Sequence, residues 1–128
     1  MLDLLLQSVS SLFTITGLSC LLGGVFIGII FGSVPGLSAT MALALFLPIT
    51  YALDPNMAVI LLIALYIGGI SGGLITAILT GIPGTPSSIA TCFDGYPMTK
   101  RNQAFKALGV GVTFSFLGTL FSTIILIF

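Results

Sequence analysis

The sequence predicts an all-α polytopic membrane protein with about three or four transmembrane helices and with Pro-Gly-interrupted segments of a kind that can re-enter the bilayer. Three acidic and three basic residues make up 5% of the chain, against roughly 25% in a soluble domain. Hydrophobic residues make up 57%, and neither 4–53 nor 55–93 contains a charge. A soluble fold of this length would need polar groups over its surface. Hydrocarbon is therefore the solvent that fits this composition.

The first predicted helix covers about 12–32, which is long enough to cross about 30 Å of hydrocarbon. No lysine or arginine precedes it, so we expect a retained helix and not a cleaved signal peptide. The run Ser33-Val34-Pro35-Gly36 then interrupts the apolar stretch. The next segment, about 38–53, contains Pro48 and is marginal for a straight span. It can be tilted, kinked or only partly inserted.

The third predicted helix covers about 56–80 and has the clearest start in the chain. Asp54 is a preferred residue just before a helix, and Pro55 suits the first helical position because its missing N–H would be unpaired there. We therefore assign Asp54 to helix capping. The run Gly81-Ile82-Pro83-Gly84 ends this helix and forms a second Pro-Gly break.

A short helix over about 86–93 is predicted after the second break, with Asp94-Gly95 as the turn that closes it. For Asp94 a second role, as a site or ion-coupling carboxylate, stays open. A cytoplasmic loop over about 94–106 and a last helix over about 107–128 follow. The last uncharged stretch has no polar tail, which indicates a fragment of a longer protein.

All three basic residues lie between Lys100 and Lys106. The positive-inside rule places this loop in the cytoplasm, and counting back through three spans places the N-terminus outside. We expect a multi-pass protein of a bacterial inner membrane, with the lipid bilayer as its surroundings. The net charge is zero, so nucleic-acid binding has no electrostatic support.

Small residues spaced by four form one face on each of two predicted helices. Such faces let two helix backbones approach closely. Ordinary helix packing accounts for them, and a role in framing a transport site is compatible with that packing. The two sets are Gly24, Gly28 and Gly32, and Gly68, Gly72, Thr76 and Thr80.

The two breaks, Pro35-Gly36 and Pro83-Gly84, remove helical hydrogen bonds at or near membrane depth. Irregular backbone there must be buried in protein or face a watery cavity. Paired Gly/Pro-interrupted segments are the best sequence indication of a transporter's binding site. The alternative is that both breaks are loops at the membrane surface.

The residues after the second break combine hydroxyl groups with a helix N-terminus. Thr85, Ser87 and Ser88 surround the start of the short predicted helix. Free N–H groups and the helix dipole attract carboxylates and phosphates at such an end. A capped helix at the membrane surface explains the same residues equally well, and both interpretations stay open.

An enzymatic interpretation has little support. Gly69-Ile70-Ser71-Gly72-Gly73 matches the G-x-S-x-G pattern of serine hydrolases, but a serine nucleophile needs a base. The chain contains no histidine. We predict no catalytic residue, no metal and no cofactor.

Three blocks of sequence, taken in order, resemble the N-terminal region of the large membrane subunit of tripartite tricarboxylate transporters, the TctA family. The first block is Gly24 to Pro55, with Val34-Pro35-Gly36-Leu37 inside it. The second is Gly72 to Leu79 followed by Ile82-Pro83-Gly84-Thr85-Pro86. The third is Asp94-Gly95-Tyr96-Pro97-Met98, then Lys100 and Ala107-Leu108-Gly109.

This resemblance implies a secondary transporter for carboxylates, driven by an ion gradient of Na+ or H+. The family's large subunit works with a small membrane subunit and a periplasmic solute-binding protein. The expected ion-coupling residue is Asp94. The expected substrate-binding residues are Pro35, Gly36, Thr76, Thr80, Pro83, Gly84, Thr85, Ser87 and Ser88.

The chain departs from the family pattern at four positions. The family commonly has serine at Leu74, asparagine at Gly81, and glycine at Ser38 and at Asn102. The alternative function, from another class, is a non-transporting membrane scaffold that oligomerises through the glycine faces.

Overall fold

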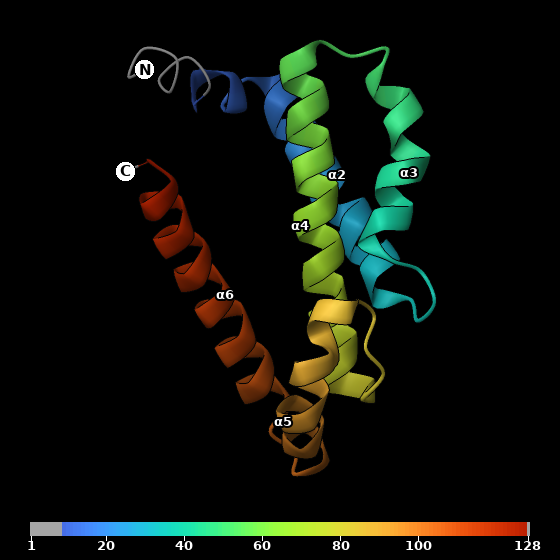
Figure 1. The fold of residues 1–128 in the computed structure, drawn as a ribbon, viewed down its shortest axis with the longest axis vertical. Helices are drawn as coiled ribbons and strands as arrows, with labels where there is room; N and C mark the ends of the chain where they lie inside the picture. Colours follow the sequence, from blue (N-terminus) through green and yellow to red (C-terminus); the bar gives the residue numbers. More distant parts are fainter. Residues whose placement is uncertain (1–8, 128) are drawn as a thin grey trace.

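The structure is a computed structural model, and it describes residues 9–127. These residues are helical without strands, which confirms the predicted all-α class. Three helices are long and apolar enough to cross a membrane: α2 (Ile15–Ser33), α4 (Pro55–Thr80) and α6 (Ala104–Ile127). Figure 1 shows α2 and α4 side by side and running in the same direction. Helix α3 (Ala39–Thr50), which connects them in the chain, runs in the opposite direction, and α6 diverges from α4.

The first break follows directly from local chemistry. Helix α2 starts where the Thr14 hydroxyl accepts a hydrogen bond from the Gly17 N–H, at 3.1 Å. It ends at Ser33 because Pro35 cannot donate the next helical bond. The Leu37 N–H donates to the Val34 carbonyl at 3.1 Å, with Gly36 at φ 95°. Proline second and a positive-φ glycine third make this a type II turn.

Helix α3 has 12 residues, which span only about 18 Å. Ser38 starts it by accepting a hydrogen bond from the Met41 N–H at 3.2 Å. Its core contact with α4 is formed by Ala42 and Leu65, both fully buried. It is therefore too short to cross a bilayer by itself, and it packs as a return segment against the first half of α4.

Helix α4 starts at Pro55, as Asp54-Pro55 predicted, but the role of the aspartate differs. The Asp54 side chain makes no capping hydrogen bond. Its backbone carbonyl accepts from the Ala58 N–H at 2.9 Å. The capping function predicted for this side chain is therefore wrong, although the position is right. Gly81, at φ 72°, ends the helix in the left-handed conformation.

The segment after the second break is longer and more regular than predicted. A 3-10 turn, η1 (Pro86–Ser88), leads directly into α5 (Ile89–Lys100). The predicted closing turn at Asp94-Gly95 is wrong, and the predicted loop over 94–106 shrinks to 101–103. Gly95 is buried because its Cα packs on Ile78 of α4, where an added methyl would lie 2.7 Å from Cγ1. This glycine serves helix contact and not a turn.

Candidate functional site

The two glycine faces contact each other within the chain. A methyl group built on Gly28 would lie 2.8 Å from the Gly69 nitrogen and 3.0 Å from the Gly68 Cα. Both neighbours are backbone atoms of α4, so nothing there can move aside as a flexible side chain could. Helices α2 and α4 therefore meet backbone to backbone, as small residues spaced by four allow.

A hydroxyl group in the second half of α4 forms a hydrogen bond with the end of α2. The Thr76 hydroxyl donates to the Ser33 carbonyl at 2.9 Å and lies 3.0 Å from the Gly72 carbonyl of its own helix. Thr76 is 5% exposed. A helix that stops inside a membrane leaves its last carbonyl groups without helical partners. Thr76 supplies one of those partners at the first break.

The chain folds back after α4, and this brings the second break to the last turn of α2. A methyl group built on Gly84 would lie 2.9 Å from the Gly73 Cα and would overlap the Gly32 carbonyl oxygen. The Thr85 hydroxyl would lie 2.7 Å from a methyl group on Gly73. Gly73 is about 10 Å before the end of α4 at Thr80. The hairpin formed by 81–100 thus re-enters alongside α4, as Figure 1 shows for the chain before α5.

The Ser88 hydroxyl and the Thr85 backbone hold the tip of this hairpin together. The Thr85 N–H donates to the Ser88 hydroxyl at 3.2 Å, and that hydroxyl donates to the Thr85 carbonyl at 2.8 Å. Thr85 and Ser88 are buried. Their polar groups satisfy the broken backbone, which would otherwise be costly in a membrane.

Other residues, distinct from the buried Thr85 and Ser88, supply the exposed hydroxyl groups beside the second break. The Ser87 side chain is exposed, and its hydroxyl lies 3.1 Å from that of Thr85. Thr80, also exposed, donates to the Thr76 carbonyl at 2.9 Å. Gly84 is half-buried. The remaining break residues that are exposed are Pro35, Gly36 and Pro83.

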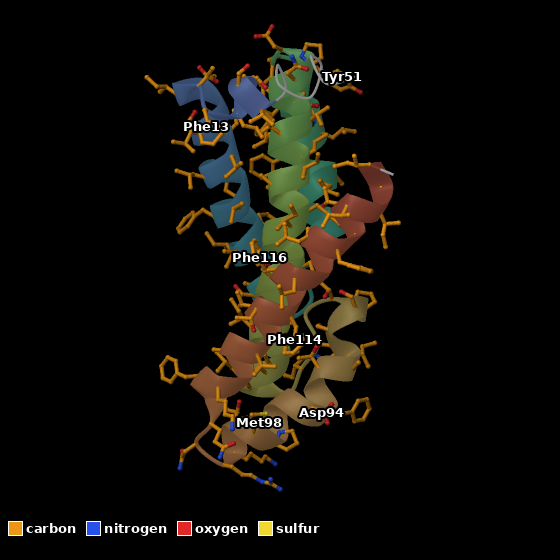
Figure 2. The ribbon with its side chains drawn as sticks, turned by 90° about the vertical axis from the view of Figure 1, so that its left-hand side faces the viewer. Phe13, Tyr51, Asp94, Met98, Phe114 and Phe116 are labelled. Carbon is orange, nitrogen blue, oxygen red and sulfur yellow. The ribbon has the colours of Figure 1, made fainter. Side chains whose placement is uncertain are left out.

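Asp94 stands apart from the two breaks. It lines a hollow of about 310 Å³ with residues of α4, α5 and α6, including Ile78, Met98 and Val110, and no residue of either break lines that hollow. Figure 2 shows Asp94 on α5, between the breaks and the α5–α6 turn. Of the predicted substrate-binding residues, Gly84 and Thr85 lie against Gly73, and Thr76 contacts Ser33 at the end of α2. Pro35 and Gly36 are exposed, and Asp94 lies elsewhere.

Comparison with known proteins settles the family. Residues 18–128 match the Tripartite tricarboxylate transporter TctA family. The chain belongs to this family. It is also 38% identical over 103 residues to the "Uncharacterized 52.8 kDa protein in TAR-I ttuC' 3'region" of Agrobacterium vitis. That match covers 80% of this chain and 20% of the relative, so the chain spans about a fifth of the relative's length. No solved structure matches.

Membership of a transporter family gives the spanning helices and the paired breaks a common context. The chain is a multi-pass membrane protein, with three helices of spanning length among residues 9–127. The resemblance found from three sequence blocks is confirmed by the match over residues 18–128.

Sequence reasoning missed the contacts that anchor the base of the hairpin in this TctA-family chain. The Thr99 hydroxyl donates to the Ile78 carbonyl at 2.7 Å, which satisfies a carbonyl near the end of α4. The Tyr96 ring packs on Gly81, where an added methyl would lie 2.8 Å away. The sequence did contain an indication of these contacts. Gly95 is followed four residues later by Thr99, the same spacing of small residues that forms the contact faces of α2 and α4.

Ser71, the serine of the G-x-S-x-G pattern, lies outside this site. It is exposed on α4 and lines a groove of about 470 Å³ between α4 and α6, together with Tyr66, Ser115 and Thr119. These neighbours carry hydroxyl groups and none is a histidine or a carboxylate. The groove therefore offers Ser71 no base among its lining residues.

Proposed function

We propose that this chain is the N-terminal part of the large membrane subunit of a secondary carboxylate transporter driven by an ion gradient. The complete system would include a small membrane subunit and a periplasmic solute-binding protein that delivers a tricarboxylate-type substrate. The membrane would be a bacterial inner membrane, with the α5–α6 turn in the cytoplasm. Family membership and the packing of the second Pro-Gly break against α4 and the last turn of α2 support this proposal.

The packing of the second break against α4 and against the last turn of α2 is the observation that supports the proposed site. Gly84 packs against Gly73 of α4 and Gly32 of α2, and the end of α2 at Ser33 lies against Gly72. Irregular backbone at membrane depth is stable only where protein or a watery cavity surrounds it. Transporters place their substrates at such interruptions, where helix ends and exposed backbone groups can bind an ion.

The predicted site residues divide into two roles in this proposal. Thr76, Thr85 and Ser88 hold the broken backbone through their hydrogen bonds. The exposed hydroxyls of Ser87 and Thr80 face the substrate path, together with the break residues Pro35, Gly36, Pro83 and Gly84. A carboxylate accepts hydrogen bonds from such hydroxyl groups and from N–H groups at a helix start.

Ion coupling through Asp94 is a separate part of the proposal. Its carboxylate is exposed in α5 and lines the hollow between α5 and α6. Coupling from there would act through movement of the hairpin, because Asp94 and the tip at Thr85 belong to the same folded segment. The coupling ion is Na+ or H+.

The scaffold alternative loses the surface on which it was based. It required the glycine faces of α2 and α4 to meet another copy of the chain. Both faces are occupied by each other, with Gly28 against Gly68 and Gly32 against Gly69. A scaffold would need another surface for oligomerisation.

Uptake of labelled carboxylates by cells that express the complete transport system tests the proposal. The variant Ser87→Ala removes an exposed hydroxyl at the hairpin tip, and we expect uptake to fall at least severalfold at normal expression. Ser19→Ala is the matched control, because Ser19 is also exposed and bonds only within α2, to the Thr16 carbonyl. Equal uptake by both variants would remove Ser87 from the site. No uptake of any di- or tricarboxylate by the unaltered system would overturn the function.

A further inference from the structure

The two ends of α4 differ in the charged residues near them. Asp54 precedes its first residue, whereas all three basic residues lie in and beside the turn between α5 and α6. Lys100, Arg101 and Lys106 are exposed. Figure 2 shows Tyr51 at one end of the molecule and Met98 near the other, with nitrogen-bearing side chains extending beyond Met98. One end of the described chain is therefore distinctly basic.

This basic turn is held in one conformation by its own backbone. The Gln103 N–H donates to the Met98 carbonyl at 2.9 Å, and the Asn102 N–H donates to the Thr99 carbonyl at 3.0 Å. Asn102 has φ 58°, so the turn is a Schellman cap with asparagine in the left-handed position. The backbone positions of the basic residues are therefore fixed relative to α5 and α6.

One of the cations is also positioned by an aromatic ring. The Lys100 nitrogen lies 4.7 Å from the centre of the Tyr96 ring, a cation–π contact. Tyr96 itself packs against Gly81 at the end of α4. Lys100 as a whole remains exposed.

An exposed aromatic side chain lies among the same cations. Phe105 is in the first turn of α6, next to Lys106, and is 92% exposed. A phenylalanine in water beside three cations is unfavourable, whereas at a membrane surface its ring can enter the acyl region while the cations meet phosphate groups. The combination fits a lipid headgroup layer better than an acidic protein segment, which would bind the charges but leave Phe105 in water.

We propose that this basic turn, defined by Lys100, Arg101, Lys106 and Phe105, binds the headgroups of anionic phospholipids. The inference does not depend on carboxylate transport. The only carboxylate on α5 is Asp94, about 10 Å along the helix from Arg101, so the positive charge of the turn is not neutralised locally. Each basic residue near an anionic membrane surface contributes roughly a fivefold gain in binding.

Lipid binding to the purified protein tests this proposal. The protein in dodecyl maltoside, stripped of lipid, is titrated with phosphatidylglycerol or phosphatidylcholine, and bound lipid is counted by native mass spectrometry. We expect phosphatidylglycerol to bind more tightly than phosphatidylcholine. The variant K100Q/R101Q/K106Q is expected to lose this preference, with a fall in phosphatidylglycerol binding on the order of 100-fold.

Two further variants and one competitor separate the alternatives. Asp54→Asn changes a charge at the opposite end and is expected to leave lipid binding unaltered. Lys106→Gln alone is expected to weaken binding about fivefold, which guards against misfolding of the triple variant. Phe105→Ala is expected to weaken binding of the lipid without abolishing it. Equal binding of the two lipids, a triple variant that retains the preference, or displacement of the lipid by equimolar inorganic phosphate would overturn the proposal.

Discussion

The α2–α4 pair and α6 are built from similar residues but are packed in opposite ways. Both contain glycines and hydroxyl-bearing residues among large apolar side chains. On α2 the glycines Gly24, Gly28 and Gly32 are buried against backbone atoms of α4. On α6 nothing lies within 4 Å of a methyl group built on Gly109 or Gly118, and Ala107 is its one buried residue between 104 and 127.

This difference shows that a small residue stabilises a membrane helix only where another helix fills the space beside it. Apolar side chains gain little by meeting each other in hydrocarbon, so close backbone packing and hydrogen bonds must hold the helices together. The α2–α4 pair has both, through the glycines and through Thr76. Helix α6 makes contact mainly near its start, where Gly111 meets Leu74.

The largest expected effect is at a backbone-to-backbone contact between α2 and α4. Gly28→Ala places a methyl group 2.8 Å from the Gly69 nitrogen, and we expect the free energy of unfolding to fall by about 1–3 kcal/mol because backbone must shift. Gly23→Ala is the matched control on the same helix, where nothing lies within 4 Å. Unfolding of the purified protein in mixed micelles with increasing SDS measures both. Equal stabilities would contradict the described packing.

A smaller effect is expected from the hydroxyl that joins the two helices. Thr76→Val removes the donor to the Ser33 carbonyl, and membrane hydrogen bonds of this kind contribute about 0.6 kcal/mol, up to about 1.7. We expect a loss in that range. Thr123→Val is the control, because that hydroxyl is exposed and bonds only within α6. A loss no greater than that of the control would show that the bond adds nothing to the contact.

The smallest effect is expected where α6 meets α4. A methyl group on Gly111 would lie 3.1 Å from the Leu74 Cδ2 atom, the end of a flexible side chain. Leu74 can rotate aside, so Gly111→Ala is expected to change the free energy of unfolding by less than about 0.5 kcal/mol. The same SDS titration measures it. A loss as large as that of Gly28→Ala would place a tight helix contact where the structure has a loose one.

Much of this fold could be predicted from the sequence because its signals are local. The apolar stretches, the two Pro-Gly breaks and the four-residue spacing of the glycines depend on neighbouring residues alone. The continuation of α5 through Asp94-Gly95 could not be predicted, since the glycine is needed by a helix that lies elsewhere in the chain, at Ile78. Glycine is favoured both in a local turn and at a close contact between helices, so the sequence around Gly95 did not distinguish the two.

Two departures from the family pattern have a shared physical explanation. The resemblance led us to expect asparagine at Gly81 and glycine at Asn102; both residues have positive φ, at 72° and 58°. Glycine and asparagine are the residues that most readily adopt this conformation at a helix end. The exchanges therefore preserve both helix ends. Nothing in the structure explains leucine at position 74.

That both breaks lie near one substrate path stays a prediction. The structure places Gly84 of the second break against Gly32 in the last turn of α2. Which hydroxyl groups are buried and which are exposed could not be foreseen, because that depends on how the hairpin folds back. Thr85 and Ser87 are two residues apart, yet one is buried and the other is exposed.

The most direct test of this account asks whether the hairpin tip lies beside the middle of α4. The double variant Gly73→Cys/Thr85→Cys, with Cys20 and Cys92 changed to serine, places two thiols where side-chain atoms of Thr85 lie 2.7 and 2.8 Å from a methyl group on Gly73. This proximity suits a disulfide, whose Cβ atoms are about 3.5–4.5 Å apart. Oxidation in native membranes, followed by mass spectrometry of alkylated thiols, is expected to link nearly all of the protein, while Gly23→Cys/Thr85→Cys stays reduced. If the 73/85 pair stayed as reduced as that control, the second break would not fold back onto α4.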